Sequence, residues 1–295
     1  MRVLVTGGAG FIGTHLTQKL LLDPAVTVRI LDNLHRGRNT FAGVPRVEFL
    51  QADIRDRQAV QAAMDGIDVV YHLAAQSNVL GAVKDMEYSF TTNVVGTFEV
   101  LSAARESGVR SVIFASSREV YGEVTSLPVS ESAPLNPKNA YGASKAAGEL
   151  YCRLFAESGM DVVVLRLANV YGPGDSERVI PLFLAHARSS RPLVIHGENK
   201  ILDFVWIGDV LDALVKVPSR GLNGQTINIG SGEGATLRDL AQKILRLTGS
   251  SSAIESGHAR KVEVDRFVAD IRLAGTLLDY RPSAPLAHLA EAAGS

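Results

Sequence analysis

Stretches of continuous apolar residues alternate along the chain with longer amphipathic stretches. The apolar runs are rich in valine, isoleucine and leucine, and they predict strands over residues 2–6, 26–32, 47–53, 68–75, 111–117 and 161–169. The amphipathic stretches predict helices over residues 11–22, about 56–64, roughly 82–107 and 140–159, with Gly108 placed to cap the third. Buried strands that alternate with helices are typical of a parallel sheet covered on both faces. The pattern therefore predicts an α/β fold with a doubly wound parallel sheet.

The regular alternation stops after residue 170. Proline and glycine follow in "YGPG" (171–174), and the later apolar runs are shorter. We therefore expect a dinucleotide-binding domain over residues 1–169 and a smaller substrate-binding lobe over residues 170–295. Residues 203–217 again have the pattern of a strand followed by a helix, and we expect them to return to the first domain.

Composition and charge indicate an ordinary globular protein. The chain has 295 residues, of which 46% are hydrophobic, and its net charge is −1. This balance gives no electrostatic reason to expect nucleic acid or a membrane surface as a partner. Cys152 is the sole cysteine, and no signal peptide or membrane-spanning run is evident, so we expect a cytoplasmic location.

A glycine-rich turn joins the first predicted strand to the first helix. Gly7, Gly10 and Gly13 are spaced by three, as required where a backbone turns tightly and presents helix N–H groups to a pyrophosphate. Asp32 ends the second strand, where its carboxylate can accept hydrogen bonds from ribose hydroxyls and would repel a 2′-phosphate. These residues predict an NAD site. Arg36 and Arg38 leave NADP open, and a turn with a surface aspartate is the alternative without a ligand.

Three further motifs follow the glycine turn in order: "HLAA" (72–75), Tyr141 with Lys145 in "YGASK", and "LRLANVYGPG" (165–174). With these motifs the sequence, from residue 2 to about 282, resembles the extended short-chain dehydrogenase/reductases that remodel nucleotide sugars. The resemblance implies a Rossmann-type NAD domain, a nucleotide-sugar lobe and a homodimer packed through helices at about 83–106 and 140–158.

The resemblance also assigns roles to individual positions. It implies that Ser117, Tyr141 and Lys145 are catalytic and that Asn169 contacts the substrate. The implied coenzyme-binding residues, besides the three glycines, Asp32, Tyr141 and Lys145, are Phe11, Ile12, Asn33, Asp53, Ile54, Leu73, Ala74, Ala75 and Asn93.

Tyr141 and Lys145 are four residues apart and therefore share one helix face. An ammonium group and the positive nicotinamide ring would both favour phenolate and lower the tyrosine pKa from its usual value of ~10. Tyr141 would then remove a proton from a sugar hydroxyl while NAD takes the hydride, with Ser117 holding the oxygen. Surface packing is the ordinary explanation for such a pair outside this context.

Arg118 and Glu119 follow directly after the strand that ends at Ser117. In the 4,6-dehydratases of the family these positions hold an Asp–Glu pair whose first member is an acid, and a guanidinium cannot supply that proton. The pattern looks most like UDP-glucuronate decarboxylases, in which oxidation at C4 makes CO₂ a good leaving group. Glu119 would then act near the sugar, and Arg118 or Arg178 would bind the substrate carboxylate. An outward-facing surface arginine is the alternative for Arg118.

One motif departs from the family. The usual Arg-Asp-aromatic triplet, whose arginine contacts the diphosphate, reads Leu202-Asp203-Phe204 here. Arg260, Arg191 and Lys200 are the candidates to replace it. The histidines lack ligand-like spacing, so no metal is expected. A UDP-glucuronate decarboxylase is thus the leading hypothesis, with a UDP- or dTDP-sugar 4-epimerase second and a non-catalytic NAD(P)-sensing protein third.

Overall fold

The computed structural model describes residues 1–176, 178–197 and 199–294, and a seven-stranded parallel sheet lies at its centre. The strand order is β11-β6-β5-β4-β1-β2-β3, so the chain starts in the middle and winds outward in both directions. The strands are β1 (Arg2–Thr6), β2 (Thr27–Asp32), β3 (Val47–Gln51), β4 (Val69–His72), β5 (Ser111–Ser117), β6 (Asp161–Leu167) and β11 (Thr226–Ile229). The predicted doubly wound fold is confirmed.

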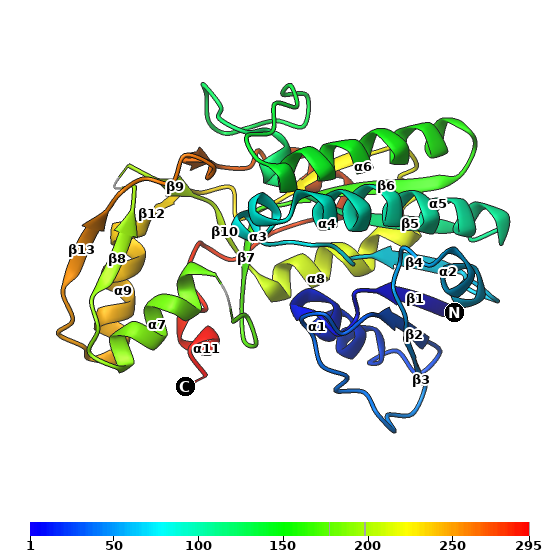
Figure 1. Cartoon of the computed structure of the whole chain (residues 1–295), viewed down its shortest axis with the longest axis horizontal. Helices are drawn as coiled ribbons and strands as arrows, with labels where there is room; N and C mark the ends of the chain where they lie inside the picture. The colour runs from blue at the N-terminus through cyan, green and yellow to red at the C-terminus, as the bar shows by residue number, and fades with distance from the viewer. Residues whose placement is uncertain (177, 198, 295) are drawn as a thin grey trace.

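Helices cover both faces of this sheet (Figure 1). One layer holds α1 (Phe11–Leu20), α8 (Ile207–Lys216) and α10 (Arg272–Leu278), and the other holds α2 (Arg57–Ala63), α5 (Gly96–Glu106) and α6 (Ala140–Glu157). Alternate residues of β1 serve the two layers, because Val3 and Val5 belong to one buried cluster and Leu4 to the other. Continuous apolar strands are therefore explained by burial on both sides.

The helix expected over residues 82–107 is broken into segments, which corrects that prediction. It consists of α3 (Val79–Lys84), α4 (Met86–Phe90), a π-helical turn η1 (Thr91–Val95) and α5. The break falls at Asp85, whose carboxylate accepts a hydrogen bond from the Tyr88 N–H at 2.9 Å and so caps a new helix. Gly108 follows with a left-handed φ of 68°, as expected for a cap.

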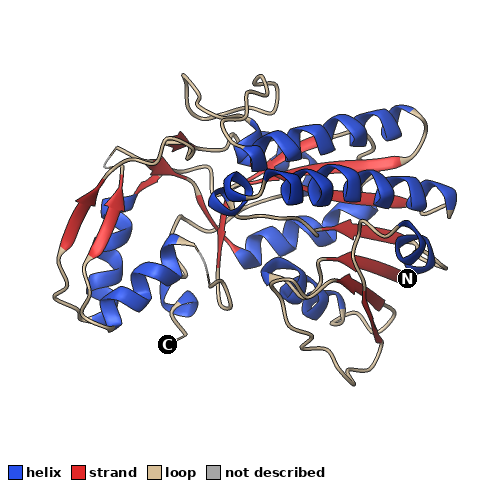
Figure 2. Ribbon diagram, in the orientation of Figure 1, coloured by secondary structure: helices blue, strands red, loops and turns tan. Residues whose placement is uncertain are grey.

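The second half of the chain divides between the sheet and a separate lobe (Figure 2). As expected, α8 packs back beside α1, and β11 and α10 return to the large domain as well. The lobe has its own apolar core between α7 (Val179–Arg188), α9 (Leu237–Thr248) and α11 (Leu289–Ala292). The strands outside the central sheet form small sheets of β8 (Leu193–His196) with β13 (Ile254–Gly257), β7 (Asn169–Tyr171) with β10 (Phe204–Trp206), and β9 (Ile201–Leu202) with β12 (Ala235–Thr236) and β14 (Arg266–Phe267). The β7–β10 pair contributes buried residues to the cores of both the large domain and the lobe.

Candidate active site

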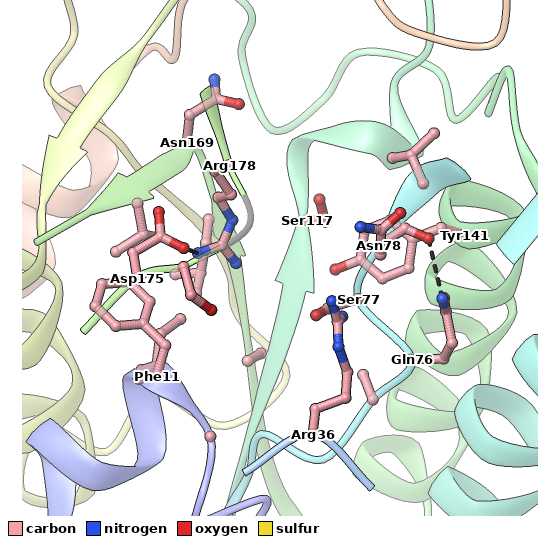
Figure 3. Close-up of a pocket in the computed structure, with 18 of the residues that line it drawn as sticks. Phe11, Arg36, Gln76, Ser77, Asn78, Ser117, Tyr141, Asn169, Asp175 and Arg178 are labelled. Carbon is pink, nitrogen blue, oxygen red and sulfur yellow. Dashed lines mark hydrogen bonds and ion pairs between the residues drawn. The ribbon is translucent and has the colours of Figure 1, made fainter. Parts of the chain in front are cut away.

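A cavity of about 920 Å³ lies between the carboxyl ends of the central strands and the lobe. Its lining includes the glycine-rich turn, the ends of β2, β4 and β5, the start of α6 and several lobe residues. In open α/β sheets ligands bind at this edge, where the direction of winding reverses. Figure 3 shows Ser117 and Tyr141 on one wall, with Asn169, Asp175 and Arg178 on the opposite wall.

The glycine-rich turn leaves no room for larger side chains. Gly7 has a φ of 73°, and a Cβ added there would lie 2.6 Å from the Ala74 nitrogen. A Cβ on Gly13 would lie 2.2 Å from the Gly7 carbonyl oxygen. The turn therefore packs closely against the start of α1 and the end of β4, and it exposes N-terminal helix N–H groups to the cavity. This cradle fits the pyrophosphate of a dinucleotide.

Asp32 and Asp53 order the adenosine end of the cavity. Asp32 accepts hydrogen bonds from the N–H groups of Ala9 at 3.0 Å and Leu34 at 2.8 Å, which ties the loop after β2 to the glycine-rich turn. Asp53 accepts from Asn33 at 2.9 Å and pairs with Arg55, and hydrogen bonds from Arg55 lower its pKa to about 2. Both carboxylates are thus fixed by hydrogen bonds beside the place expected for the adenosine.

Asn93 positions the loop that follows β4. Its side-chain oxygen accepts from the Gln76 N–H at 2.7 Å, and its amide donates to the Gln76 carbonyl at 3.0 Å and to the Ser144 hydroxyl at 2.9 Å. Leu73, Ala74 and Ala75 line the cavity just before this loop. Asn93 is itself buried, so it acts on the coenzyme site by holding this loop in place.

Ser117, Tyr141 and Lys145 come together as the motif predicts. Ser117 ends β5, and Tyr141 lies in the first turn of α6, which Asn139 caps by accepting from the Gly142 N–H at 2.8 Å. Lys145 is buried one turn further on and donates to the Ala115 carbonyl at 2.8 Å. All three residues line the cavity.

Protonation at this group differs from the expectation for tyrosine. Burial raises the pKa of Tyr141, and a hydrogen bond to Ser117 and the charges of Arg178 and Arg118 oppose this only in part. Among the protein's own groups, desolvation therefore disfavours phenolate more than the neighbouring charges favour it. The predicted lowering also includes the positive charge of the nicotinamide ring, which these groups do not supply. Burial also lowers the pKa of Lys145, to about 8.

Arg118 and Glu119 form a buried ion pair on the cavity wall. They begin a short 3₁₀ turn, η2 (Arg118–Val120), and Arg118 Nη2 lies 2.8 Å from Glu119 Oε1. Arg118 also donates through Nε to Asn169 Oδ1 at 3.3 Å, and Glu119 Oε2 accepts from the Asn139 amide at 2.7 Å. The outward-facing alternative for Arg118 is wrong, because only 10% of its side chain is exposed.

The predicted cations of the substrate end have different positions. Arg178 lines the cavity beside Asp175, 3.3 Å from its Oδ1, with its guanidinium 5.6 Å from the centre of the Phe11 ring (Figure 3). Arg260 and Lys200 also line the cavity. Arg191 lies outside the described lining and donates to the Ser189 hydroxyl at 2.9 Å, so the structure gives its predicted role in substrate binding no support.

Asp203 has a structural role in the triplet that lacks its arginine. Its carboxylate accepts hydrogen bonds from the N–H groups of Ser231 at 2.7 Å, Gly232 at 3.2 Å and Ala269 at 3.1 Å. Leu202 lines the cavity in the place of the expected arginine. The triplet therefore still orders the backbone here, although it brings no charge to the substrate.

Sequence reasoning missed a polar chain beneath the coenzyme site. The His72 ring contacts the hydroxyls of Thr6 at 2.7 Å and Thr97 at 2.9 Å, and Thr6 accepts from the Ala74 N–H at 3.4 Å. Burial and then the Lys145 charge lower the pKa of His72 to about 3, so the ring is neutral. A histidine at the end of a buried strand was the available signal, because a buried polar ring requires hydrogen-bond partners.

Within the described ranges, 1–176, 178–197 and 199–294, no cluster of side chains could hold a metal ion. The same part of the chain contains no helix that is long and apolar enough to cross a bilayer.

The fold and this site define a class of NAD-dependent enzymes that use a tyrosine, a lysine and a serine beside the nicotinamide. Comparison with known proteins identifies the group more narrowly. Residues 3–230 match the model of the NAD dependent epimerase/dehydratase family, and the chain belongs to this family.

Individual relatives cover nearly the whole chain. UDP-glucose 4-epimerase of Mycolicibacterium smegmatis is 34% identical over 97% of this chain and 95% of its own. UDP-N-acetyl-alpha-D-glucosaminuronate decarboxylase of Bacillus cytotoxicus is 35% identical over 86% of this chain and 82% of its own. The crystal structure of Thermus thermophilus UDP-glucose 4-epimerase in complex with NAD is 33% identical, with a TM-score of 0.91 over 100% of this chain and 98% of its own. The protein is therefore an NAD-dependent enzyme of nucleotide-sugar type.

Proposed function

We propose that this enzyme oxidises C4 of a UDP-sugar and reduces the resulting ketone again, so that it acts as a 4-epimerase. NAD, held on the glycine-rich turn, would accept the hydride from C4 and return it to the opposite face of the ketone, which inverts the configuration at C4. Tyr141 would accept the proton of the C4 hydroxyl, and Ser117 would hold that oxygen by a hydrogen bond. Lys145 would position Tyr141 from the next turn of α6, and its positive charge would favour phenolate.

The observation that carries this proposal is the buried ion pair of Arg118 with Glu119, in which both Glu119 oxygens have a partner. Arg118 neutralises one oxygen of Glu119, and Asn139 occupies the other. Neither side chain is then an acid that could expel a hydroxyl from C6, which disfavours a dehydratase. Because Glu119 is paired with Arg118, its negative charge also cannot strongly repel a substrate carboxylate that leaves as CO₂. The sugar therefore meets Tyr141 and Ser117 as its acid–base groups, which is sufficient for oxidation and reduction at one carbon.

A UDP-glucuronate decarboxylase is the second candidate. Glu119 lines the cavity two residues after Ser117, as the resemblance to decarboxylases requires, and Arg178 is exposed enough to meet a substrate carboxylate. One relative at 35% identity is named as a decarboxylase of a UDP-sugar acid. This reaction also begins with oxidation at C4, so it would use Tyr141, Ser117 and Lys145 in the same roles.

Product analysis separates these candidates. The enzyme would be incubated with NAD and UDP-glucose, UDP-galactose or UDP-glucuronate, with the matching dTDP-sugars in parallel, and the products followed by mass spectrometry and NMR. A C4 isomer of unchanged mass supports the epimerase, and loss of CO₂ from UDP-glucuronate supports the decarboxylase. Absence of turnover on the whole panel would contradict both and leave the sensor.

Tyr141→Phe provides the residue-level test of this chemistry. We expect kcat to fall by about 10²- to 10⁴-fold, the range for loss of a positioned acid–base group, with NAD still bound. The aromatic ring remains, so packing in α6 is preserved. Tyr151→Phe, on the exposed side of the same helix, is the matched control and should retain activity. A normal rate in Tyr141→Phe would remove this tyrosine from the mechanism.

The helices that the resemblance assigns to a dimer interface carry exposed apolar side chains. Phe90 is 56% exposed on α4 and Leu154 is 54% exposed on α6. Phe98 of α5 contacts Tyr151 of α6 with ring centres 5.4 Å apart, so the two helices share one apolar surface. A second copy of the chain would cover this surface, and we therefore include a homodimer in the proposal.

A further inference from the structure

Two cations beside Leu202 are held by one carboxylate. Lys200 Nζ donates to Glu263 Oε2, and Arg260 Nη1 donates to Glu263 Oε1 at 2.9 Å. Lys200, Leu202, Arg260 and Glu263 all line the large cavity. The position that lacks the expected arginine therefore has a cation two residues earlier, and that cation already has an internal anionic partner.

The backbone, and not the carboxylate alone, places Glu263. The Glu263 carbonyl accepts from Lys138 at 2.8 Å, and the Asp265 N–H donates to Glu123 at 3.2 Å. The Ile201 N–H donates to the Asp265 carbonyl at 3.0 Å, which joins this segment to β9. The carboxylate is thus presented to the cations by a segment that other contacts keep in place.

The Lys200 ammonium group is shielded from water and requires an anionic partner. Its side chain is only 4% exposed, and a buried ammonium group is costly unless it is paired. Although burial favours the neutral acid, hydrogen bonds from Lys200 and Arg260 hold the pKa of Glu263 below its ordinary value, so the carboxylate is ionised. Asp265 Oδ1, at 3.9 Å from Lys200, is the remaining acidic neighbour.

We propose that Lys200 replaces the missing diphosphate arginine, and that Glu263 is an internal competitor occupying Lys200 and Arg260 until the substrate diphosphate displaces it. This inference rests on the proposed nucleotide-sugar function and names how the site binds its diphosphate. A diphosphate offers two negative groups for the two cations, whereas Glu263 offers one charge between them. Before binding, the carboxylate keeps the cations paired and aligned toward the cavity.

The test is calorimetric titration of the NAD-loaded enzyme with UDP and, separately, with UMP. Lys200→Met should raise the Kd for UDP by about 10- to 100-fold, the range for loss of a charge-assisted hydrogen bond, with a smaller change for UMP. Lys200→Arg should retain UDP binding. Lys261→Met is the matched control, since Lys261 is exposed and lies outside the described cavity lining.

Glu263→Gln gives the opposite and more diagnostic effect. Removal of the competitor should lower the Kd for UDP and the KM for the nucleotide sugar by about 3- to 10-fold, with little change in kcat, because uniform binding would improve. Glu255→Gln, at an exposed position on β13, is its control. Weaker UDP binding in Glu263→Gln, or an unchanged Kd in folded Lys200→Met, would overturn the proposal and leave these contacts as structural.

This outcome is independent of the reaction proposed above. UDP binding that responds to Lys200 and Glu263 without turnover of any sugar would contradict the epimerase and support the diphosphate site. Turnover of UDP-sugars, with a UDP Kd that is unchanged in the Lys200 and Glu263 variants, would support the proposed reaction and contradict the diphosphate site. Thermal melting of each variant checks that the comparison is made on folded protein.

Discussion

Burial determines the protonation of the side chains beneath the coenzyme cleft. His72 lies at the end of β4 between two threonine hydroxyls, and Lys145 lies under Tyr141 against the Phe114 ring. Both have pKa values below their ordinary ranges, mainly because desolvation disfavours the cation. At physiological pH the His72 ring is therefore neutral, whereas Lys145, with a pKa of about 8, keeps most of its positive charge beneath Tyr141.

This arrangement predicts a pH dependence of stability. The unfolded chain protonates His72 near pH 6.5, whereas the folded protein resists protonation until about pH 3, so the unfolded state binds more protons in between. The stability contribution is complete above pH 6.5 and falls with acidification by about 1.4 kcal/mol per pH unit. Between pH 6.5 and 5 the wild-type protein should lose about 2 kcal/mol more unfolding free energy than His72→Asn.

Urea unfolding of both proteins at pH 6.5 and pH 5 measures this difference. Other titrating groups contribute equally to both chains and cancel in the comparison. Equal pH dependence in the two proteins would show that His72 is protonated in the folded state at pH 5.

At this scale the sequence predicted which of the proposed site residues lie together better than it predicted their environment. Tyr141 and Lys145 could be found because their spacing on a helix face is a local property. The direction of the Tyr141 pKa could not, since it depends on burial by segments far along the chain. Likewise Arg191 and Lys200 were equal candidates from sequence to replace the diphosphate arginine. The structure distinguishes them, because Lys200, just before β9, lines the cavity, whereas Arg191, in the turn after α7, does not belong to the described lining.

At the scale of elements, the first strand–turn–helix unit forms the coenzyme cradle. Gly13 lies at the point where α1 meets the Gly7 carbonyl, with no space for a methyl group. The start of the helix, its N–H groups and the turn are thus one packed unit. Spacing of glycines in the sequence predicted this unit because its geometry is almost entirely local.

Gly13→Ala tests that packing. The new methyl group would displace α1 from the turn, and we expect the NAD Kd to rise by about 100-fold, as for loss of several pyrophosphate contacts. Gly275→Ala in α10 is the matched control, because its nearest neighbour would be 3.8 Å away. Fluorescence titration with NADH measures both. Unchanged affinity in Gly13→Ala would mean that the turn adapts and does not define the site.

The broken helix before α5 shows where local patterns are insufficient. Apolar residues recur through positions 82–107 with helical spacing, but Asp85 and Asn78 cap separate short helices within and before this stretch. A carboxylate within such a pattern can lie on the exposed face of one continuous helix, or it can cap the start of a new helix. In the structure the Asp85 carboxylate caps α4, and Asn93 in the following π-helical turn bonds to Gln76 in the loop after β4.

At the scale of the whole molecule, segments that are far apart in the sequence together form the large domain. Strand β11 and helices α8 and α10 belong to the large domain, although they come after the first lobe segments. The sequence predicted that residues 203–217 return to the large domain; of these, helix α8 packs against α1, whereas β10 pairs with β7 outside the central sheet. The four-residue strand β11 gives a weaker local signal, and its pairing with β6 is a long-range contact that periodicity does not reveal.

The proposed homodimer is tested by a charge on the apolar surface. Leu154→Glu would place a carboxylate in the interface, and we expect monomers by light scattering after gel filtration. Leu22→Glu is the control, since Leu22 is 81% exposed at the end of α1, away from α4–α6. Light scattering that gives a monomer mass for the wild-type protein would contradict the proposal, as would a Leu154→Glu variant that remains dimeric.

The hydrogen bonds made by Asp203 have a consequence for how this site can vary. Because that carboxylate joins β10 to the segments around Ser231 and Ala269, the local backbone shape is set without help from the preceding side chain. Leu202 is itself buried in the apolar core of the lobe, so a charge at this position would have to extend into the cavity that the residue lines. A side chain that did so could change which ligands bind at this corner, while Asp203 kept the adjoining backbone in place.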